Sequence, residues 1–152
     1  MKYNSFMIVS IIIALFSGCK DSASSPDELK SGTIQLSVSG TPNFNNHKIY
    51  FSIWDSCNPN TGEPAGVMKG VGFFVVKNGT GSALMLSPDA QTVNLFKPGK
   101  YFPYYFVDMN DNFNATTDMT DSGDYVGGGK DYQITVEGDV VKQLTLQDFT
   151  IL

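Results

Sequence analysis

The chain has 152 residues with ten lysines, no arginine and fifteen acidic residues, which gives a formal net charge of −5. Such a chain is a poor candidate for binding nucleic acid, because the phosphate backbone is held mainly by clustered basic side chains. One histidine and two cysteines are too few for a zinc enzyme, and the sequence has neither a Gly-x-Ser-x-Gly nucleophile motif nor a Gly-rich phosphate loop.

Residues 1–18 have the pattern of a secretory signal. Lys2 supplies one positive charge, and only Ser10 is polar between residues 6 and 16. This run is too short for a transmembrane helix, which needs ~20 apolar residues, but it matches the ~7–15-residue core of a signal peptide. It ends in Phe16-Ser17-Gly18-Cys19, which resembles the lipobox of bacterial lipoproteins, with Phe16 where leucine is commonest.

This resemblance implies cleavage between Gly18 and Cys19 and attachment of lipid to Cys19. Acyl chains would hold the mature protein at a membrane of the bacterial cell envelope, and we favour the outer membrane. The alternative is a signal peptide followed by a cysteine that carries no lipid. With Cys19 lipidated, Cys57 has no cysteine left to form an internal disulfide.

Residues 19–32 are polar and contain serine, proline and glycine, which is typical of a flexible tether. Fully extended, they would span roughly 40 Å. Residues 33–152 are then one domain, long enough to bury a core.

From residue 33 onward, apolar residues recur with a period of two rather than 3.6, which indicates β-strands. We expect strands at 33–39, 48–54, 71–77, 82–86, 92–96, 101–108, 132–136 and 140–146. Asn78-Gly79 favours a type I′ hairpin, and residues 137–139 are expected to join the last two strands as a pair. The pattern predicts an all-β fold, an antiparallel β-sandwich of about seven strands, Ig-like or transthyretin-like.

The segment Lys97-Pro98-Gly99-Lys100-Tyr101, followed by a strand ending in Phe106-Val107-Asp108, resembles transthyretin-like and carboxypeptidase-regulatory-like sandwiches. The resemblance covers roughly residues 33–148. Because such sandwiches host many functions, it implies a fold rather than an activity.

Residues 108–129 contain five aspartates, three asparagines and no lysine. Carboxylate and amide oxygens are the ligands that Ca²⁺ prefers, and a cation would relieve the repulsion between these acids. The predicted calcium ligands are Asp108, Asn110, Asn112, Asn114, Asp121 and Asp124. Phe113 and Met119 replace the glycine and glutamate of an EF-hand, so the segment is not an EF-hand. The alternative is a solvated loop without metal, and Gly127-Gly128-Gly129 is expected to be a flexible connector.

The strand 101–106 is strongly aromatic. Alternation places Tyr101, Pro103 and Tyr105 on one face, with Phe102, Tyr104 and Phe106 on the other, and Pro103 indicates an edge strand or a bulge. With Trp54 pointing outward, the sequence predicts a surface for a glycan or a partner protein at Trp54 and Tyr105. Ordinary packing of core and sheet is the alternative.

The leading hypothesis is a non-enzymatic, lipid-anchored envelope protein with a calcium-stabilised loop. The alternatives are a surface module that binds a glycan or a host protein, and a small hydrolase that uses paired acids of the loop. The sequence identifies no catalytic residue.

Overall fold

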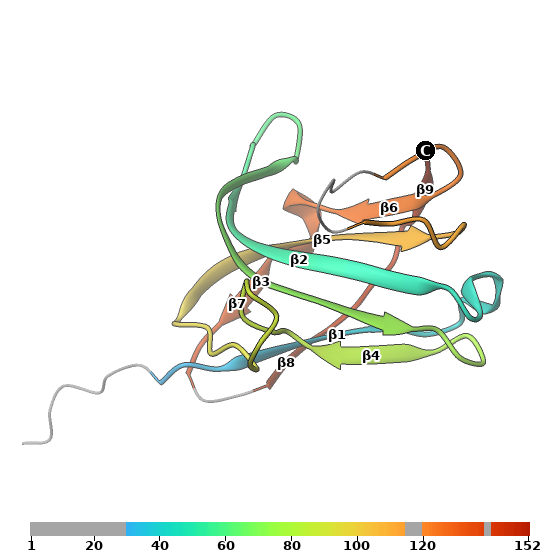
Figure 1. Ribbon diagram of the computed structural model, residues 1–152. Helices are drawn as coiled ribbons and strands as arrows, with labels where there is room; N and C mark the ends of the chain where they lie inside the picture. Colours follow the sequence, from blue (N-terminus) through green and yellow to red (C-terminus); the bar gives the residue numbers. More distant parts are fainter. Residues whose placement is uncertain (1–29, 115–119, 139–140) are drawn as a thin grey trace, which may run out of the picture.

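The computed structural model describes residues 30–114, 120–138 and 141–152 (Figure 1). The predicted signal peptide, Cys19 and most of the tether lie outside these residues. No helix in the described part of the chain is long and apolar enough to cross a membrane. The elements are β1 (Thr33–Val38), η1 (Pro42–Phe44), β2 (Lys48–Cys57), β3 (Pro64–Val75), β4 (Gly81–Leu84), β5 (Gly99–Asp108), β6 (Tyr125–Gly128), η2 (Lys130–Tyr132), β7 (Ile134–Val136), β8 (Val141–Thr145) and β9 (Thr150–Ile151).

The strands form two sheets, which confirms the predicted all-β sandwich. The smaller sheet has the order β4-β1-β8, and the larger has the order β3-β2-β5-β6-β9 with β7 also paired to β5. Apolar side chains of alternate residues meet between the sheets, and Ile34, Ile53 and Val107 are completely buried there. Burial of this apolar surface, at ~25 cal/mol per Å², is the main stabilising contribution to the fold.

The predicted pairing of the last two strands is wrong. β7 pairs with β5 in the larger sheet, whereas β8 runs parallel to β1 in the smaller one. The turn around Gly138 therefore carries the chain from one sheet to the other. β7 and β8 each have one apolar face. Two such strands can bury these faces as neighbours in one sheet or as members of two sheets that face each other across the core.

The turn between β3 and β4 is the predicted type I′ turn. Asn78 and Gly79 have φ angles of 53° and 72°, and the backbone groups of Lys77 and Thr80 are hydrogen-bonded to each other. Beyond the turn, however, β4 pairs with β1. The strand predicted at 92–96 is wrong, since the segment forms only isolated bridges at Val93 and Phe96.

Three differences from the predicted strands affect the larger sheet. β3 begins at Pro64, earlier than predicted, and the β2–β3 hairpin bends where the register shifts around Trp54. β6 and β9 were not predicted. Of the glycine run predicted as a connector, Gly127 and Gly128 belong to β6 and Gly129 follows it. Position 127 requires glycine, because a Cβ there would lie 2.4 Å from the ring of Tyr105.

Pro103 does not mark an edge strand, because β5 lies inside the larger sheet between β2 and β6. On the side of β5 away from β2, the partner strand changes along its length. β7 pairs with β5 up to Tyr101, and β6 pairs with it from Tyr104 onward. Proline has no N–H to donate, and its carbonyl accepts a hydrogen bond from Gly129 instead. The residue is tolerated at the junction of two partner strands.

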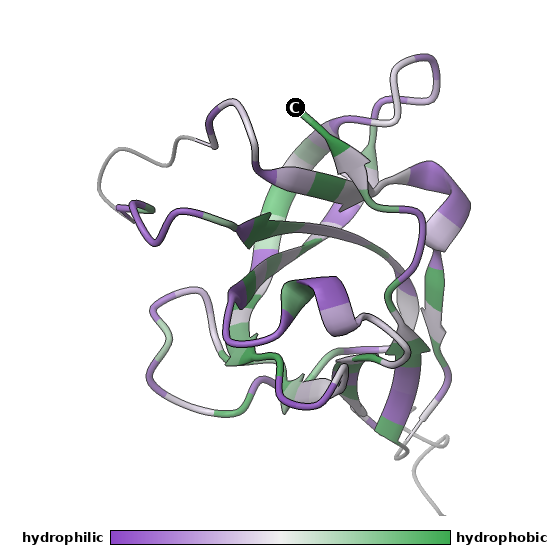
Figure 2. Cartoon of the chain, turned by 90° about the vertical axis from the view of Figure 1, so that its right-hand side faces the viewer, coloured by the Kyte–Doolittle hydropathy of each residue, from purple (hydrophilic) through white to green (hydrophobic). Residues whose placement is uncertain are grey.

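The sandwich has two different ends. At the N-terminal end, β1 begins beside Phe96 and β5 begins at Gly99 (Figure 1). At the acidic end, β5 finishes at Asp108 and the Asn78-Gly79 turn closes β3. Figure 2 faces the acidic end, where the loops are largely hydrophilic.

Candidate ligand-binding face and acidic loop

The outer face of the larger sheet is aromatic. Residues of β2 alternate, so that Ile49, Phe51 and Ile53 face the core while the residues between them face outward. Tyr50 lies opposite Phe73 of β3 and Phe106 of β5. We call this surface the aromatic face, and its members are Tyr50, Trp54, Phe73, Phe102, Tyr104 and Phe106.

Three rings of the aromatic face are in contact, since Tyr50 packs on both Phe73 and Phe106. The centroids of Tyr50 and Phe106 are 5.1 Å apart and their planes differ by 18°. Phe113, from the acidic loop, covers both, with centroid distances of 4.4 Å to Tyr50 and 4.7 Å to Phe106. Such pairs contribute ~0.5–1.5 kcal/mol beyond their buried area, so the contacts around Tyr50 favour the observed arrangement of these rings.

A hollow of about 710 Å³ lies over the aromatic face. Its walls come from the sheet, from the segment Leu86–Ala90 and from Phe113 and Thr120. Ser52 and Asp89 add polar groups, and the Ser52 hydroxyl accepts a hydrogen bond of 2.9 Å from the Trp54 indole N–H. A mostly apolar concavity of this size with a few polar groups is typical of a site for a small ligand.

The two predicted binding residues both border the hollow, but they lie on different faces of the larger sheet and differ in exposure. Trp54 is partly exposed and lines the hollow with its ring held by Ser52. Tyr105 belongs to the core face of β5, is only 3% exposed and donates its hydroxyl hydrogen to the carbonyl of Gln147. Burial raises the pKa of Tyr105 well above its ordinary value. Tyr105 also borders the hollow, but its ring belongs to the covered face of β5, so its role in binding stays a prediction.

Tyr104 is on the correct face, and its hydroxyl is engaged. It donates a hydrogen bond to the carbonyl of Gly62, in the loop between β2 and β3. Burial raises the pKa of Tyr104 to about 12. The phenol thus fixes the loop at the N-terminal end of the aromatic face and stays neutral at physiological pH.

Two buried carboxylates hold the acidic loop together. Asp108 and Asp124 are each 1% exposed. The oxygens of Asp108 accept hydrogen bonds of 3.2 Å from the backbone N–H groups of Asn112 and Phe113. Those of Asp124 accept from Met109 at 3.0 Å and from Asp121 at 3.1 Å. Each aspartate satisfies two loop N–H groups, which sets the path of the loop and places Phe113 over the aromatic face.

Asp121 joins the predicted calcium ligands into one network. It accepts hydrogen bonds from the side-chain amides of Asn110 and Asn112, the former at 3.0 Å. Asn114 is exposed at the edge of the described part of the loop. In residues 30–114, 120–138 and 141–152, no three His, Cys, Asp or Glu side chains form a group that could hold a metal ion.

In the described residues, the buried carboxylates of Asp108 and Asp124 have no ion pair with lysine. The ion pair of the loop joins Lys48 to the exposed Asp111 at 3.8 Å. Their charges are therefore stabilised by backbone N–H dipoles.

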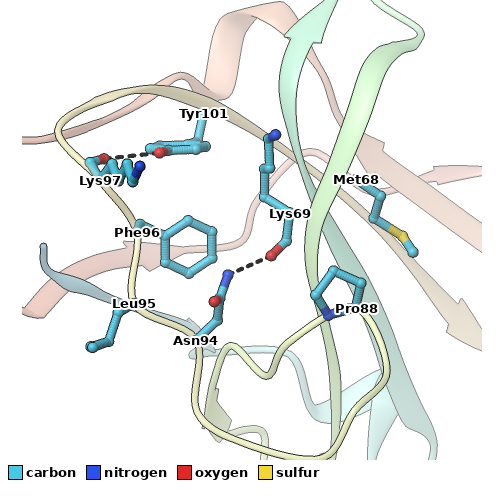
Figure 3. Close-up of a pocket in the computed structure, with 8 residues that line it drawn as sticks. All are labelled: Met68, Lys69, Pro88, Asn94, Leu95, Phe96, Lys97 and Tyr101. Atoms are coloured by element: carbon cyan, nitrogen blue, oxygen red, sulfur yellow. Dashed lines mark hydrogen bonds between the residues drawn. The ribbon is translucent and has the colours of Figure 1, made fainter.

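A second, smaller hollow of about 380 Å³ lies at the N-terminal end, between β3 and the segment 94–97 (Figure 3). The Asn94 amide donates to the carbonyl of Lys69, and the Tyr101 hydroxyl donates to the carbonyl of Lys97 at 2.8 Å. Phe96 points into the space, while Leu95 points away from it (Figure 3). Two of its lining side chains, Asn94 and Tyr101, are thus occupied by backbone carbonyls of the lining.

Fold and geometry define the chain as a β-sandwich protein with an aromatic face and a hydrogen-bonded acidic loop. No family model matches the chain, and neither the curated proteins nor the solved structures contain a match.

Proposed function

We propose that this chain is a lipid-anchored, non-enzymatic protein of the bacterial cell envelope that binds a glycan on its aromatic face. The observation that carries the proposal is the hollow over that face, where aromatic rings from three strands line a space of about 710 Å³. A soluble domain that leaves a large apolar surface uncovered usually uses it for binding.

Sugar is the ligand class that fits the chemistry of this surface. The C–H faces of a sugar ring can stack on flat aromatic rings, while hydroxyl groups need polar partners at the rim. Ser52, Asp89 and Thr120 offer such partners around the hollow. Among the described residues of the lining, Asp89 is the one that carries a charge, which favours a neutral glycan over an anionic ligand.

The test is binding of envelope and host glycans to the mature protein, by calorimetry or a glycan array, with two variants. Trp54→Ala and Phe73→Ala should each weaken binding by more than about tenfold, because aromatic side chains at the centre of a site often contribute ~2 kcal/mol or more. Phe73 is 55% exposed, so its removal should leave the core intact. The matched control is Leu84→Ala, a partly exposed apolar residue of the other sheet. Unchanged binding in both aromatic variants would contradict the proposal.

Attachment to the membrane is supported by Phe16-Ser17-Gly18-Cys19 at the end of the apolar signal. Replacing the cysteine, in Cys19→Ala, should release the protein from the membrane fraction without detergent. If the variant still sediments with membranes, the lipid attachment is wrong.

Calcium bound by the acidic loop remains part of the proposal, in a structural role. Its support is the burial of Asp108 and Asp124 without a lysine partner, since a divalent cation could use the lone pairs that their backbone bonds leave free. A ligand that binds only the folded state adds ~2.7 kcal/mol at about a hundred times its dissociation constant. The melting temperature should therefore be higher in millimolar calcium than in chelator, and equal melting temperatures would count against the metal.

The geometry supports binding better than hydrolysis. Hydrolysis by paired acids needs two carboxylates that reach the substrate. All four oxygens of Asp108 and Asp124 accept backbone N–H groups, and both residues are buried. Loss of a measured glycosidase activity in Asp121→Asn would favour the hydrolase instead.

A further inference from the structure

The outer face of the smaller sheet changes in character along its length. Its first cross-strand row, at the N-terminal end, contains Thr33 with Val141 of β8 beside it, and Leu95 precedes the Phe96–Gly32 bridge on the other side. Leu95 is 65% exposed and Val141 is 52% exposed. Val93, at 46%, precedes Leu95 by two residues and forms a bridge with Leu86. We call Val93, Leu95 and Val141 the apolar rim.

Further along the same face the side chains become polar. The next row combines Leu84, Gln35 and Gln143, and the row after it consists of Ser82, Ser37 and Thr145. The exposed apolar groups are thus concentrated where the chain enters the domain rather than spread over the sheet. Scattered single apolar residues need no explanation, but a group of three at one end is a candidate contact surface.

The position of the entry point limits what can lie against the apolar rim. Gly32 is held to Phe96 by two backbone hydrogen bonds of 2.8 and 2.9 Å. Cys19 precedes Gly32 by 13 residues, which span at most about 45 Å. With lipid on Cys19, the tether joins the domain at this end of the sandwich, and the ten-residue strand β5 separates it from the acidic end.

The charges of the two ends also differ. Lys30, Lys97 and Lys100 are exposed near the entry point, together with Glu137 in the turn after β7. The β2–β3 hairpin at the same end adds the exposed Glu63 and Asp55, and Asp55 is paired with Lys69. The opposite end carries the acidic loop. Anionic headgroups attract lysines and repel carboxylates, so they favour the orientation that brings the N-terminal end to the membrane.

We propose that the N-terminal end of the sandwich rests on the bilayer surface, with the apolar rim among the lipid headgroups and Lys97 near their phosphates. The inference rests on the proposed lipid attachment. It orients the domain with its strands rising from the membrane and the acidic loop far from it. The outer face of the larger sheet then stands free above the lipid, open to a ligand.

The experiment uses the mature, lipidated protein in vesicles of phosphatidylethanolamine and phosphatidylglycerol. In a Cys57→Ser background, Leu95→Cys carries an environment-sensitive fluorophore. Ser82→Cys, on the same sheet face at the other end, is the matched control. The label at position 95 should shift to the blue and be quenched by spin-labelled headgroups, whereas the label at position 82 should do neither. Equal, water-like emission at both positions, in protein that floats with the vesicles, would overturn the orientation.

Two further outcomes keep the inference distinct from the proposals on which it rests. If the protein does not float with the vesicles, the lipid attachment has failed, and with it the orientation. A blue shift at position 95 that depends on protein concentration in detergent, without vesicles, would identify the apolar rim as a contact between two copies of the chain and would overturn the bilayer contact. Glycan binding is measured separately and can fail while the orientation holds.

Discussion

Asp124→Ala tests whether hydrogen bonds hold the acidic loop in its conformation. The carboxylate of Asp124 is 1% exposed and accepts the N–H groups of Met109 and Asp121, at 3.0 and 3.1 Å. Alanine leaves both part-buried donors without this partner. A fully buried donor that loses its partner costs ~1–3 kcal/mol, so the two together set an upper range of about 2–6 kcal/mol, and the variant should lose unfolding free energy near the lower end of it.

The assay is thermal unfolding followed by circular dichroism, in calcium and in chelator. For a domain of this size a loss of that magnitude lowers the melting temperature by on the order of 10 °C. Because the bonds that are lost run to backbone N–H groups, the decrease should occur in both buffers. The matched control is Asp111→Asn, which removes a charge from the same loop at a side chain that is 63% exposed and should change the unfolding free energy by less than ~0.5 kcal/mol.

One result would refute this reasoning. If Asp124→Ala and the unaltered protein melt together in chelator but differ in calcium, Asp124 acts only as a metal ligand, and the hydrogen bonds contribute nothing measurable. A large effect of Asp111→Asn would instead indicate that repulsion within the loop, rather than its internal bonding, controls stability.

Three further predictions concern the sheet and its turns. Gly127→Ala should cost ~1–3 kcal/mol, since its Cβ would lie 2.4 Å from the ring of Tyr105, and a lower urea midpoint with an unchanged slope would confirm it. Because Tyr104 keeps its proton up to about pH 12 in the folded chain, stability should be full below pH 10 and fall between pH 10 and 12, where only the unfolded chain ionises. Melting curves of Tyr104→Phe should show a shallower decline over that range. Gly79→Ala should cost ~1 kcal/mol in the same urea assay, because its φ is 72°.

The predictable part of the fold is the part controlled by local chemistry. Alternation identified the buried face of β1 and β2, and the Asn78-Gly79 pair identified a turn that needs positive φ at two positions. Pairing was not predictable in the same way. β8 could bury its apolar face beside β7 or across the core, and only the shape of the whole sandwich, with a free edge on β1, decides that it pairs with β1 in parallel.

At the site, too, the local sequence pattern does not determine which side chains are covered by the rest of the fold. Alternation correctly places Tyr105 and Phe106 on opposite faces of β5, but both faces of this strand are aromatic, so the pattern does not say which one is covered. The answer depends on Tyr132 and Phe149, whose rings pack on Tyr105 from distant parts of the sequence. Phe113 was even less accessible to sequence reasoning, because its contact with Tyr50 exists only when Asp108 draws the loop back over the sheet. The acids that suggested calcium thus position an aromatic ring, and a perturbation of the loop should therefore also weaken binding on the aromatic face.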